Sequence, residues 1–174
     1  MKLFNKNIVL IGMTGVGKTT LGKILSKETG REYLDIDKEI EQLSNLKIKD
    51  FFNTYGENEF RKLEKITLLK CLKGNNNLVI SPGAGVLQDK ELKKQLIKEC
   101  VCIFLNAKIK TLAKRLKKNI SNRPKLNEGK LEDNLKQMYI ERIQDYKEAQ
   151  ITIDVDDIPI PDIISKIKES LSKL

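Results

Sequence analysis

Gly12-Met13-Thr14-Gly15-Val16-Gly17-Lys18-Thr19 is the stretch that decides the fold of this chain. It fits the pattern G-x-x-x-x-G-K-S/T, in which glycines let backbone N–H groups turn toward phosphate oxygens. An apolar run at residues 7–11 precedes it, and the segment after it carries Leu21, Ile24 and Leu25 at helical spacing. A strand, this loop and a helix in that order are the context that phosphate binding requires. The stretch therefore predicts a nucleotide-binding P-loop.

The same loop indicates which groups hold the nucleotide. Lys18 would neutralise charge on the β- and γ-phosphates, and the Thr19 hydroxyl would be a ligand of Mg²⁺. The ATP-binding residues predicted here are Gly15, Val16, Gly17, Lys18, Thr19 and Thr20. A chain of this length matches the pattern by chance on the order of one per cent of the time. The alternative is a glycine-rich turn that merely connects a strand to a helix.

The rest of the chain alternates short apolar runs with amphipathic segments. Further strands are expected at residues 33–35, 78–80, 101–105 and 151–155. Helices are expected at residues 36–43, 48–55, 57–72, 109–116, 131–149 and 163–171. Parallel neighbouring strands need a long return connection, which is usually a helix. We therefore expect a single α/β domain over residues 1–174, a three-layer αβα sandwich with a five-stranded parallel sheet, of the P-loop NTPase or nucleoside-monophosphate-kinase type.

Several residues mark the faces and ends of these helices. Ile36, Ile40 and Leu43 are expected on one face of their helix. Gly56 should stop the helix that precedes it, and Asp162 should cap the last one. Residues 117–130 are polar, charged and interrupted by proline and glycine, which is typical of a mobile lid.

The composition limits the chemistry and the location. Of the 174 residues, 40% are hydrophobic and 33% charged, and no apolar run approaches the ~20 residues that span a bilayer. The absence of histidine excludes hydrolase mechanisms based on a Ser–His–Asp or Cys–His arrangement.

Cys71, Cys100 and Cys102 are odd in number and lack metal-ligand spacing, so we expect reduced core residues. Residues 1–10 lack the features of a secretory signal, and we expect a cytoplasmic monomer without a membrane partner.

The chain has 33 basic and 24 acidic residues, a net charge of +9. Such a balance is compatible with nucleic acid, an acidic membrane or small anions as partners. Lys is abundant along the whole chain, as on solvated helix faces. The charge by itself therefore does not predict nucleic-acid binding.

Two carboxylates follow the second predicted strand. Asp35 and Asp37 leave the end of a strand that we expect beside the P-loop strand, where open α/β sheets bind ligands. One could reach Mg²⁺ through water, and the other could reach the hydroxyl group of an acceptor. The alternative is an aspartate that N-caps the next helix.

Arg61 lies in the sequence Gly56-Glu57-Asn58-Glu59-Phe60-Arg61-Lys62-Leu63-Glu64. On a helix it has Glu57 four residues before it and Glu64 three residues after it. An exposed ladder of ion pairs therefore explains Arg61 as well as the binding of a substrate carboxylate does. From helical spacing alone we favour the ladder.

Six features of the chain, in this order, resemble the shikimate kinase family. They are the P-loop, D-x-D at residues 35–37, G-E-x-x-F-R-x-x-E at residues 56–64, a glycine turn after the third strand, Arg123-Pro124 in the lid, and E-R-x-x-x-Y at residues 141–146. The resemblance spans nearly the whole chain. It implies ATP-dependent phosphorylation of shikimate to shikimate 3-phosphate with Mg²⁺, a step of chorismate and aromatic amino-acid biosynthesis.

The resemblance also implies roles for single residues. Asp37 would contact the acceptor hydroxyl as the candidate base, and Asp35 would lie near Mg²⁺. Arg61 and Arg142 would clamp the substrate carboxylate, which the planar fork of a guanidinium group matches bidentately. Glu64 would orient these groups.

Two further arginines follow from the resemblance. Arg123 is similar to the lid arginine that closes over the phosphates and stabilises the transferred charge. Arg115 is similar in position to an arginine that lies against adenine, and its alternative is a solvated helix residue. For Arg142 the alternative is an ion pair with Asp145, three residues further on.

The chain departs from the family pattern after the third strand, where three consecutive glycines are usual and this chain has Pro82-Gly83-Ala84-Gly85. Pro82 has no N–H to donate, and Ala84 adds a methyl group and disfavours a positive φ, so we expect a different pocket floor. Gly83 could still donate to the acceptor.

In the lid, Lys125 replaces an apolar residue. The acceptor therefore stays open: alternatives are a kinase for another small anionic metabolite such as gluconate, or an ATP-binding regulatory module without kinase turnover.

Overall fold

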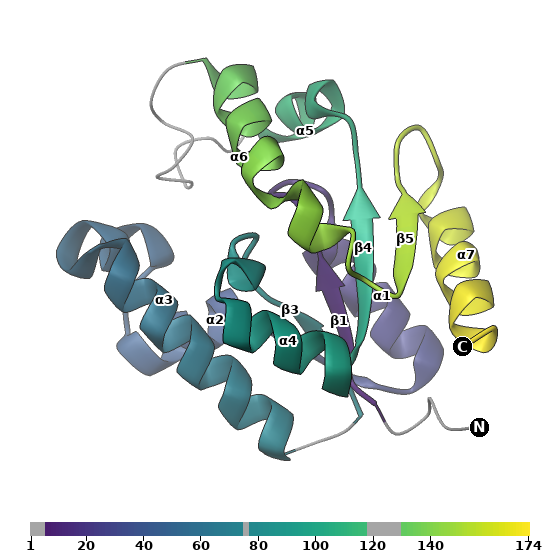
Figure 1. The fold of residues 1–174 in the computed structure, drawn as a ribbon, viewed down its shortest axis with the longest axis horizontal. Coiled ribbons are helices and arrows are strands. Elements are labelled where there is room, and N and C mark those ends of the chain that lie inside the picture. The colour runs from purple at the N-terminus through teal and green to yellow at the C-terminus, as the bar shows by residue number, and fades with distance from the viewer. Residues whose placement is uncertain (1–5, 75–76, 118–129) are drawn as a thin grey trace.

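The computed structural model describes residues 6–74, 77–117 and 130–174 (Figure 1). Within them, five strands form one sheet in the order β2-β3-β1-β4-β5, and every neighbouring pair is parallel. The strands are β1 (Ile8–Ile11), β2 (Glu32–Asp35), β3 (Leu78–Ser81), β4 (Val101–Asn106) and β5 (Ile151–Asp154). The predicted five-stranded parallel sheet is confirmed.

The burial of each strand follows its place in the sheet. All residues of β1 and β3 are buried, as are those of β4 up to Leu105, because helices cover both faces of the inner strands. The edge strand β5 alternates buried and exposed residues, and β2 is half-buried.

The expected neighbour of the P-loop strand was wrong: β3, not β2, pairs with β1 on that side. The fully buried β3, apolar except for Ser81, suits an inner position, whereas the polar residues of β2 suit an edge. The carboxyl end of β2 is therefore one strand further from the P-loop than predicted.

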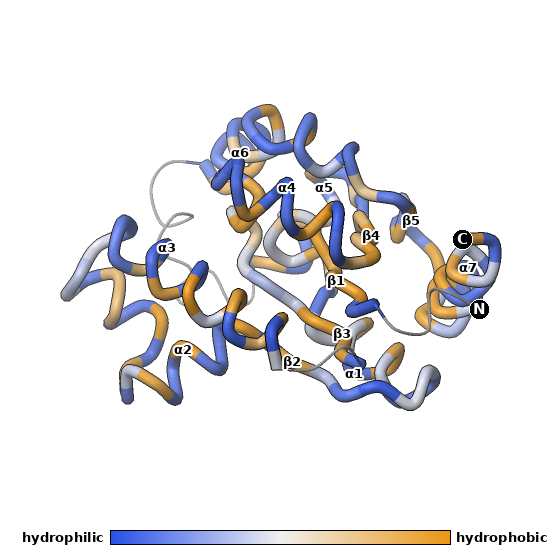
Figure 2. The backbone as a smooth tube through the Cα atoms, turned by 60° about the horizontal axis from the view of Figure 1, so that its bottom comes forward, coloured by the Kyte–Doolittle hydropathy of each residue, from blue (hydrophilic) through white to orange (hydrophobic). Residues whose placement is uncertain are grey.

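Helices lie on both faces of the sheet and complete the three layers (Figure 1). On one face, α1 (Lys18–Thr29) packs on β1, β2 and β3 and contacts α7 (Ile160–Ser172), which lies on β5. On the other face, α4 (Lys90–Glu99) packs on β4, and α6 (Leu131–Tyr146) packs on α5 (Ile109–Leu116). Hydrophobic residues gather on the strands and on the helix sides that face them (Figure 2).

The remaining pair of helices forms a lobe beside β2 and β3. There α2 (Ile36–Ser44) packs on α3 (Ile48–Gly74) (Figures 1 and 2). Gly56 interrupts α3 with φ 78° and ψ 176°, as the sequence predicts. The rings of Phe52 and Phe60 meet across this break with centroids 4.6 Å apart, so the two segments of α3 pack on each other.

No helix is predicted between the third and fourth strands, but the structure has the short helix η2 (Val86–Gln88) and α4 there. Asp89 caps α4, since its side chain accepts a hydrogen bond from the Leu92 N–H at 2.9 Å. Leu92 and Leu96 are buried. An N-cap aspartate before two leucines four residues apart is the pattern that identifies this helix.

Ile36 and Ile40 of α2 are buried, whereas Leu43, expected on the same face, is 60% exposed one residue before the helix ends. The expected cap of the last helix was wrong. Asp162 lies in the first turn of α7, whose N-cap is Pro159. A proline in the first helical turn needs no N–H partner, which lets α7 begin earlier than predicted.

The cysteines agree with their prediction as unpaired residues. Cys100 and Cys102 are buried and free, and burial raises the pKa of both thiols to about 12. Cys71 is half-buried and free. In the part of the chain that the structure describes, none of the helices has the length and apolar character needed to cross a membrane.

Candidate active site

A cavity of about 750 Å³ opens at the carboxyl ends of β1, β2 and β3. Open parallel sheets bind ligands at this edge, in the crevice beside a central strand such as β1. The predicted site residues that line the cavity are Gly15, Gly17, Lys18, Thr19, Thr20, Asp35, Asp37, Arg61, Gly83 and Arg142. The predicted Val16 and Arg115 are not among the lining residues, and Arg123 and Lys125 lie outside the described residues.

The P-loop connects β1 to α1 in a conformation that only glycine permits at its start. Gly12 has φ 142°, and a Cβ atom there would lie 2.5 Å from the Leu105 carbonyl oxygen. The Lys18 Nζ donates to the carbonyl oxygens of Gly12 at 2.8 Å and Met13 at 3.2 Å, which holds the lysine along the loop. Because α1 begins at Lys18, the positive end of its dipole faces the cavity.

Asp35, the last residue of β2, forms a hydrogen bond with a residue at the start of α1. Its Oδ2 accepts hydrogen bonds from the Thr19 hydroxyl and the Tyr33 hydroxyl, both at 3.1 Å. Asp35 occupies the N-cap position of α2, but its side chain makes no capping hydrogen bond. The capping alternative therefore does not account for this carboxylate.

The oxygens of Thr19 and Asp35 fit a magnesium ion. Mg²⁺ prefers oxygen ligands, keeps several waters, and is held by one or two protein groups together with phosphate oxygens. Across the described ranges there is no group of three or more acidic or cysteine side chains that could hold a metal by itself. The donor set therefore suits an ion that arrives with a nucleotide.

Asp37 lies in the first turn of α2, and its Oδ1 is buried without a hydrogen-bond partner. The pKa of Asp37 is raised to about 6: burial is the largest cause, the carboxylates of Glu64 and Asp35 also raise it, and Lys18 and Arg61 lower it. A carboxylate with a pKa near neutrality and an unpaired oxygen at a cavity is suited to accept a proton from a hydroxyl group.

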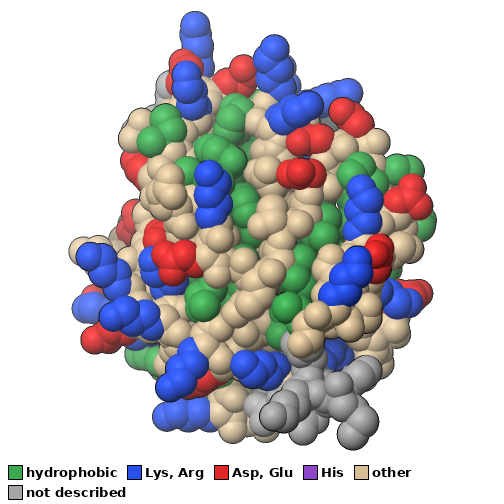
Figure 3. All heavy atoms as spheres, turned by 45° about the vertical axis from the view of Figure 1, so that its right-hand side comes forward, with side chains coloured by type: hydrophobic (Ala, Val, Ile, Leu, Met, Phe, Trp, Pro, Cys, Tyr) green, Lys and Arg blue, Asp and Glu red, His purple; other side chains and the backbone are tan. Residues whose placement is uncertain are grey.

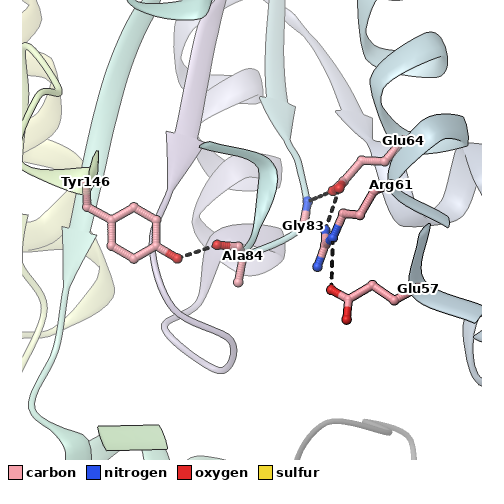
Figure 4. Close-up of polar contacts among 6 residues, drawn as sticks. All are labelled: Glu57, Arg61, Glu64, Gly83, Ala84 and Tyr146. Atoms are coloured by element: carbon pink, nitrogen blue, oxygen red, sulfur yellow. Dashed lines mark hydrogen bonds and ion pairs between the residues drawn. The ribbon is translucent and has the colours of Figure 1, made fainter. Parts of the chain in front are cut away.

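Arg61 is held by carboxylates on both sides along α3 (Figure 4). It pairs with Glu57 at 3.4 Å and with Glu64, so the predicted ladder exists. The ladder is not an exposed one, since only 2% of the Glu64 side chain is exposed. Although burial lowers the pKa of Arg61, the two glutamates raise it above its usual value. The ladder therefore fixes a charged arginine at the cavity wall and does not compete with substrate binding.

The turn after β3 packs tightly against this pair. A Cβ atom at Gly83 would lie 2.3 Å from the Glu64 Oε1, and one at Gly85 would lie 2.6 Å from the Arg61 Nη2. The Gly83 N–H, predicted to be available to the acceptor, donates to Glu64 at 3.0 Å. Both glycines are needed for this close approach.

Ala84 lies between these glycines without strain. Its φ is not positive, so the conflict expected from its methyl group does not arise. Its carbonyl oxygen accepts a hydrogen bond from the Tyr146 hydroxyl (Figure 4). The turn is thus bound from both sides of the cavity.

Arg142 reaches the cavity from α6 and is only 3% exposed. Its Nε is buried without a hydrogen-bond partner. Asp145, the alternative partner, pairs with Lys93 at 2.7 Å. A buried guanidinium group with an unused donor is a site for an anion, because burying such a charge without a partner is costly.

Arg115 supports the P-loop from outside the cavity. Its guanidinium group donates to the carbonyl oxygens of Val16 at 3.0 Å and Val155 at 3.3 Å. It is thus bound to backbone and is not simply solvated. It connects α5 to the phosphate loop and to the end of β5.

Sequence reasoning assigned no part in the site to Tyr33 and Ser81. Tyr33 binds Asp35, and the Ser81 hydroxyl donates to the Lys18 carbonyl oxygen at 3.2 Å. Tyr33 lies two residues before Asp35, and residues two apart share a face of a strand. That spacing is the signal that could have found it.

The family model for shikimate kinase matches residues 14–172. This chain belongs to the shikimate kinase family. Shikimate kinase of Bacillus licheniformis is 35% identical over 167 residues, covering 96% of this chain and 94% of that relative. Shikimate kinase of Thermoanaerobacter pseudethanolicus is 35% identical over 169 residues, covering 97% and 98%.

Solved structures of the family share the fold. Shikimate kinase from Acinetobacter baumannii, in complex with shikimate, superposes with a TM-score of 0.91 at 30% identity and covers 99% of this chain and 97% of its own. A gluconokinase from Sinorhizobium meliloti reaches a TM-score of 0.61 at 15% identity, with coverage of 98% and 93%, and shares the fold alone.

Proposed function

We propose that this chain transfers the γ-phosphoryl group of ATP to a hydroxyl of shikimate, forming shikimate 3-phosphate for aromatic amino-acid biosynthesis. The observation that carries the proposal is one cavity that joins a P-loop to the unpaired Oδ1 of Asp37 and the unpaired Nε of Arg142. Shikimate carries a carboxylate and several hydroxyl groups, the partners that these two side chains lack. Membership of the shikimate kinase family supports the same acceptor.

The nucleotide half of the reaction uses the P-loop. Its backbone and the amino end of α1 receive the phosphates, and Lys18 neutralises their charge. Thr19 and Asp35 are the residues that would hold Mg²⁺, which when bound neutralises negative charge on the phosphates. We assign Arg123 to closure over the phosphates and Arg115 to the adenine side of the site. The Arg115 hydrogen bond to Val16 supports its place beside the loop.

The acceptor half needs orientation and one proton transfer. Arg61 and Arg142 hold the carboxylate at one end, so that one hydroxyl is in line with the γ-phosphorus. That hydroxyl oxygen forms a bond to phosphorus while the bond from phosphorus to the leaving oxygen of ADP breaks. Asp37 accepts the hydroxyl proton. The reaction asks little else of the protein, because positioning and charge neutralisation supply most of the catalysis.

The expected setting is a cytoplasmic monomer whose partners are ATP and shikimate. On the face that Figure 3 shows, basic and acidic side chains are interspersed among uncharged and hydrophobic ones. On this face, the distribution supports the interpretation of Lys residues as solvated surface and not as a nucleic-acid site.

The test is ADP release by the purified chain with ATP and Mg²⁺, with and without shikimate, with gluconate and a nucleoside monophosphate as comparison acceptors. Asp37→Asn should lower kcat about 100-fold or more, and Arg61→Ala should mainly raise the KM for shikimate. Lys62→Ala is the matched control, because Lys62 neighbours Arg61 on α3 but forms an exposed pair with Glu59. ATP binding without shikimate-dependent release would overturn the proposal.

A further inference from the structure

Tyr146 ends α6 and is 1% exposed. Its ring stacks on that of Phe104 in β4, with centroids 5.1 Å apart and 26° between the planes. Tyr146 is not among the residues that line the cavity. A large side chain with a polar end is therefore fixed between the sheet and α6, behind the wall of the proposed active site.

The hydroxyl group of Tyr146 contacts two parts of the acceptor side. It donates to the Ala84 carbonyl oxygen, 62 residues away along the chain (Figure 4). Arg142, one helical turn earlier on α6, lies close enough to the Tyr146 hydroxyl group to lower its pKa by charge and hydrogen bonding. Burial raises the pKa of Tyr146 to about 12, so the hydroxyl group stays protonated at neutral pH.

The turn that Tyr146 binds is held from its other side by α3. The Gly83 N–H donates to Glu64, which pairs with Arg61. Residues 83–85 therefore lie between the two helices that carry Arg61 and Arg142. A movement of the turn away from either helix would change the distance between the two guanidinium groups.

We propose that Tyr146 is a positioning residue, which couples Arg142 to the turn at residues 83–85 and so sets the spacing of the two arginines that bind the acceptor. The proposal rests on the proposed function of this cavity. Tyr146 does not line the cavity, so it would act only through Ala84 and Arg142. The P-loop is not part of this connection, so the nucleotide side should not depend on the Tyr146 hydroxyl.

Tyr146→Phe tests the proposal, because it keeps the ring stacked on Phe104 and removes only the hydroxyl. The KM for shikimate should rise about tenfold, while the KM for ATP stays within twofold of wild type. A general loss of structure would not separate the two constants in this way. Tyr139→Phe is the matched control: Tyr139 lies on the same helix and donates to Asn106 at 3.3 Å, outside the cavity lining.

Amide hydrogen exchange provides a readout that needs no acceptor. Within the turn, the Val86 N–H donates to Gly83 and the Gln88 N–H to Gly85. Both amides should exchange at least tenfold faster in Tyr146→Phe, with the amides of β1 as internal reference, and should be unchanged in Tyr139→Phe.

The outcomes separate the two proposals. Absence of shikimate-dependent turnover in the wild-type chain means that the proposed function fails, and the exchange rates alone then decide the role of Tyr146. Unchanged exchange at Val86 and Gln88 overturns the coupling. With turnover present, a KM for shikimate within twofold of wild type, or an equal rise of both KM values, overturns it as well.

Discussion

The Glu64 carboxylate binds Gly83 and Arg61 with its two oxygens. Its Oε1 accepts the Gly83 N–H at 3.0 Å, and its Oε2 accepts the Arg61 Nη1. Glu64 is buried, and its charge is also among the causes that raise the pKa of Asp37. One carboxylate thus connects the arginine, the turn and the candidate base, so a change at Glu64 should affect binding and proton transfer together.

Glu64→Gln should separate the charge of this side chain from its shape. Gln retains an oxygen for the Gly83 N–H but loses the negative charge. The pKa of Asp37 should then fall, and the acidic limb of kcat/KM for shikimate should move to lower pH. The KM for shikimate should rise several-fold, since Arg61 loses its buried partner. Rates measured from pH 5 to 8 test both effects.

The matched control for that experiment is Glu57→Gln. Glu57 also pairs with Arg61, at 3.4 Å, but it is half exposed and is not among the causes that shift the pKa of Asp37. Its pH profile should keep the wild-type limb. An equal shift in both variants would contradict a specific effect of Glu64 on Asp37.

Ionisation of the buried Asp37 carboxyl group should lower the free energy of unfolding of the protein at neutral pH. Its pKa is raised to about 6, chiefly by burial, so well below about pH 4 the group is protonated in both the folded and the unfolded state and costs nothing. As the pH rises through 4 to 6, the unfolded chain ionises first and stability falls. Asp37→Asn removes this cost. After allowance for solvent screening, the gain above pH 7 is on the order of 1–2 kcal/mol, or roughly 2–8 °C in Tm.

Thermal unfolding at pH 4.5 and pH 8 checks this sign. The difference in Tm between Asp37→Asn and wild type should be clearly larger at pH 8. A difference that is equal at both pH values would show that Asp37 carries no ionisation cost. The same variant should lose activity, so stability and catalysis oppose each other at this residue.

Local patterns predicted most of the fold and most of the cavity. The P-loop, the break at Gly56 and the alternation of strands and helices need only neighbouring residues, and they were confirmed. The order of strands was not accessible in this way, because pairing of β3 with β1 depends on contacts between distant segments. For the same reason the conflict predicted between the Ala84 methyl group and a positive φ was wrong. Its backbone conformation depends on the whole turn.

The arginines show the same limit. Helical spacing predicted that Glu57 and Glu64 pair with Arg61, and they do. It could not predict that Glu64 is buried against Gly83, since that contact joins residues 19 apart on different elements. Helical spacing likewise gave Asp145 as a possible ion-pair partner of Arg142, but Asp145 pairs with Lys93 on α4. Side chains on other elements decided both cases.

Gly85→Ala should damage acceptor binding by steric contact alone. Gly85 has φ −98°, which alanine adopts freely, so no backbone strain is added. A methyl group there would lie 2.6 Å from the Arg61 Nη2 and would displace the guanidinium group. The KM for shikimate should rise about tenfold or more, with the KM for ATP little changed. Steady-state kinetics with each substrate varied in turn measure this.

Gly74→Ala is the control for a generic effect of replacing glycine. Gly74 ends α3, and a Cβ atom there would meet nothing within 4 Å. This variant should keep both KM values. Wild-type kinetics in Gly85→Ala would show that the guanidinium group of Arg61 can move without loss of binding.

Arg142→Lys should show whether the planar fork or only the charge of this buried residue is needed. The Arg142 Nε has no partner within the protein, which leaves it available for a carboxylate oxygen. Lys offers a single point charge in place of the bidentate fork. We expect the KM for shikimate to rise roughly 10- to 100-fold, while kcat changes less, because the lost contact is equally strong in the ground state and the transition state. Arg31→Lys, at a residue that donates to the Lys6 carbonyl oxygen, should leave both constants unchanged. A fall in kcat with an unchanged KM would instead place Arg142 against the transferred phosphoryl group and leave Arg61 as the sole ligand of the acceptor carboxylate.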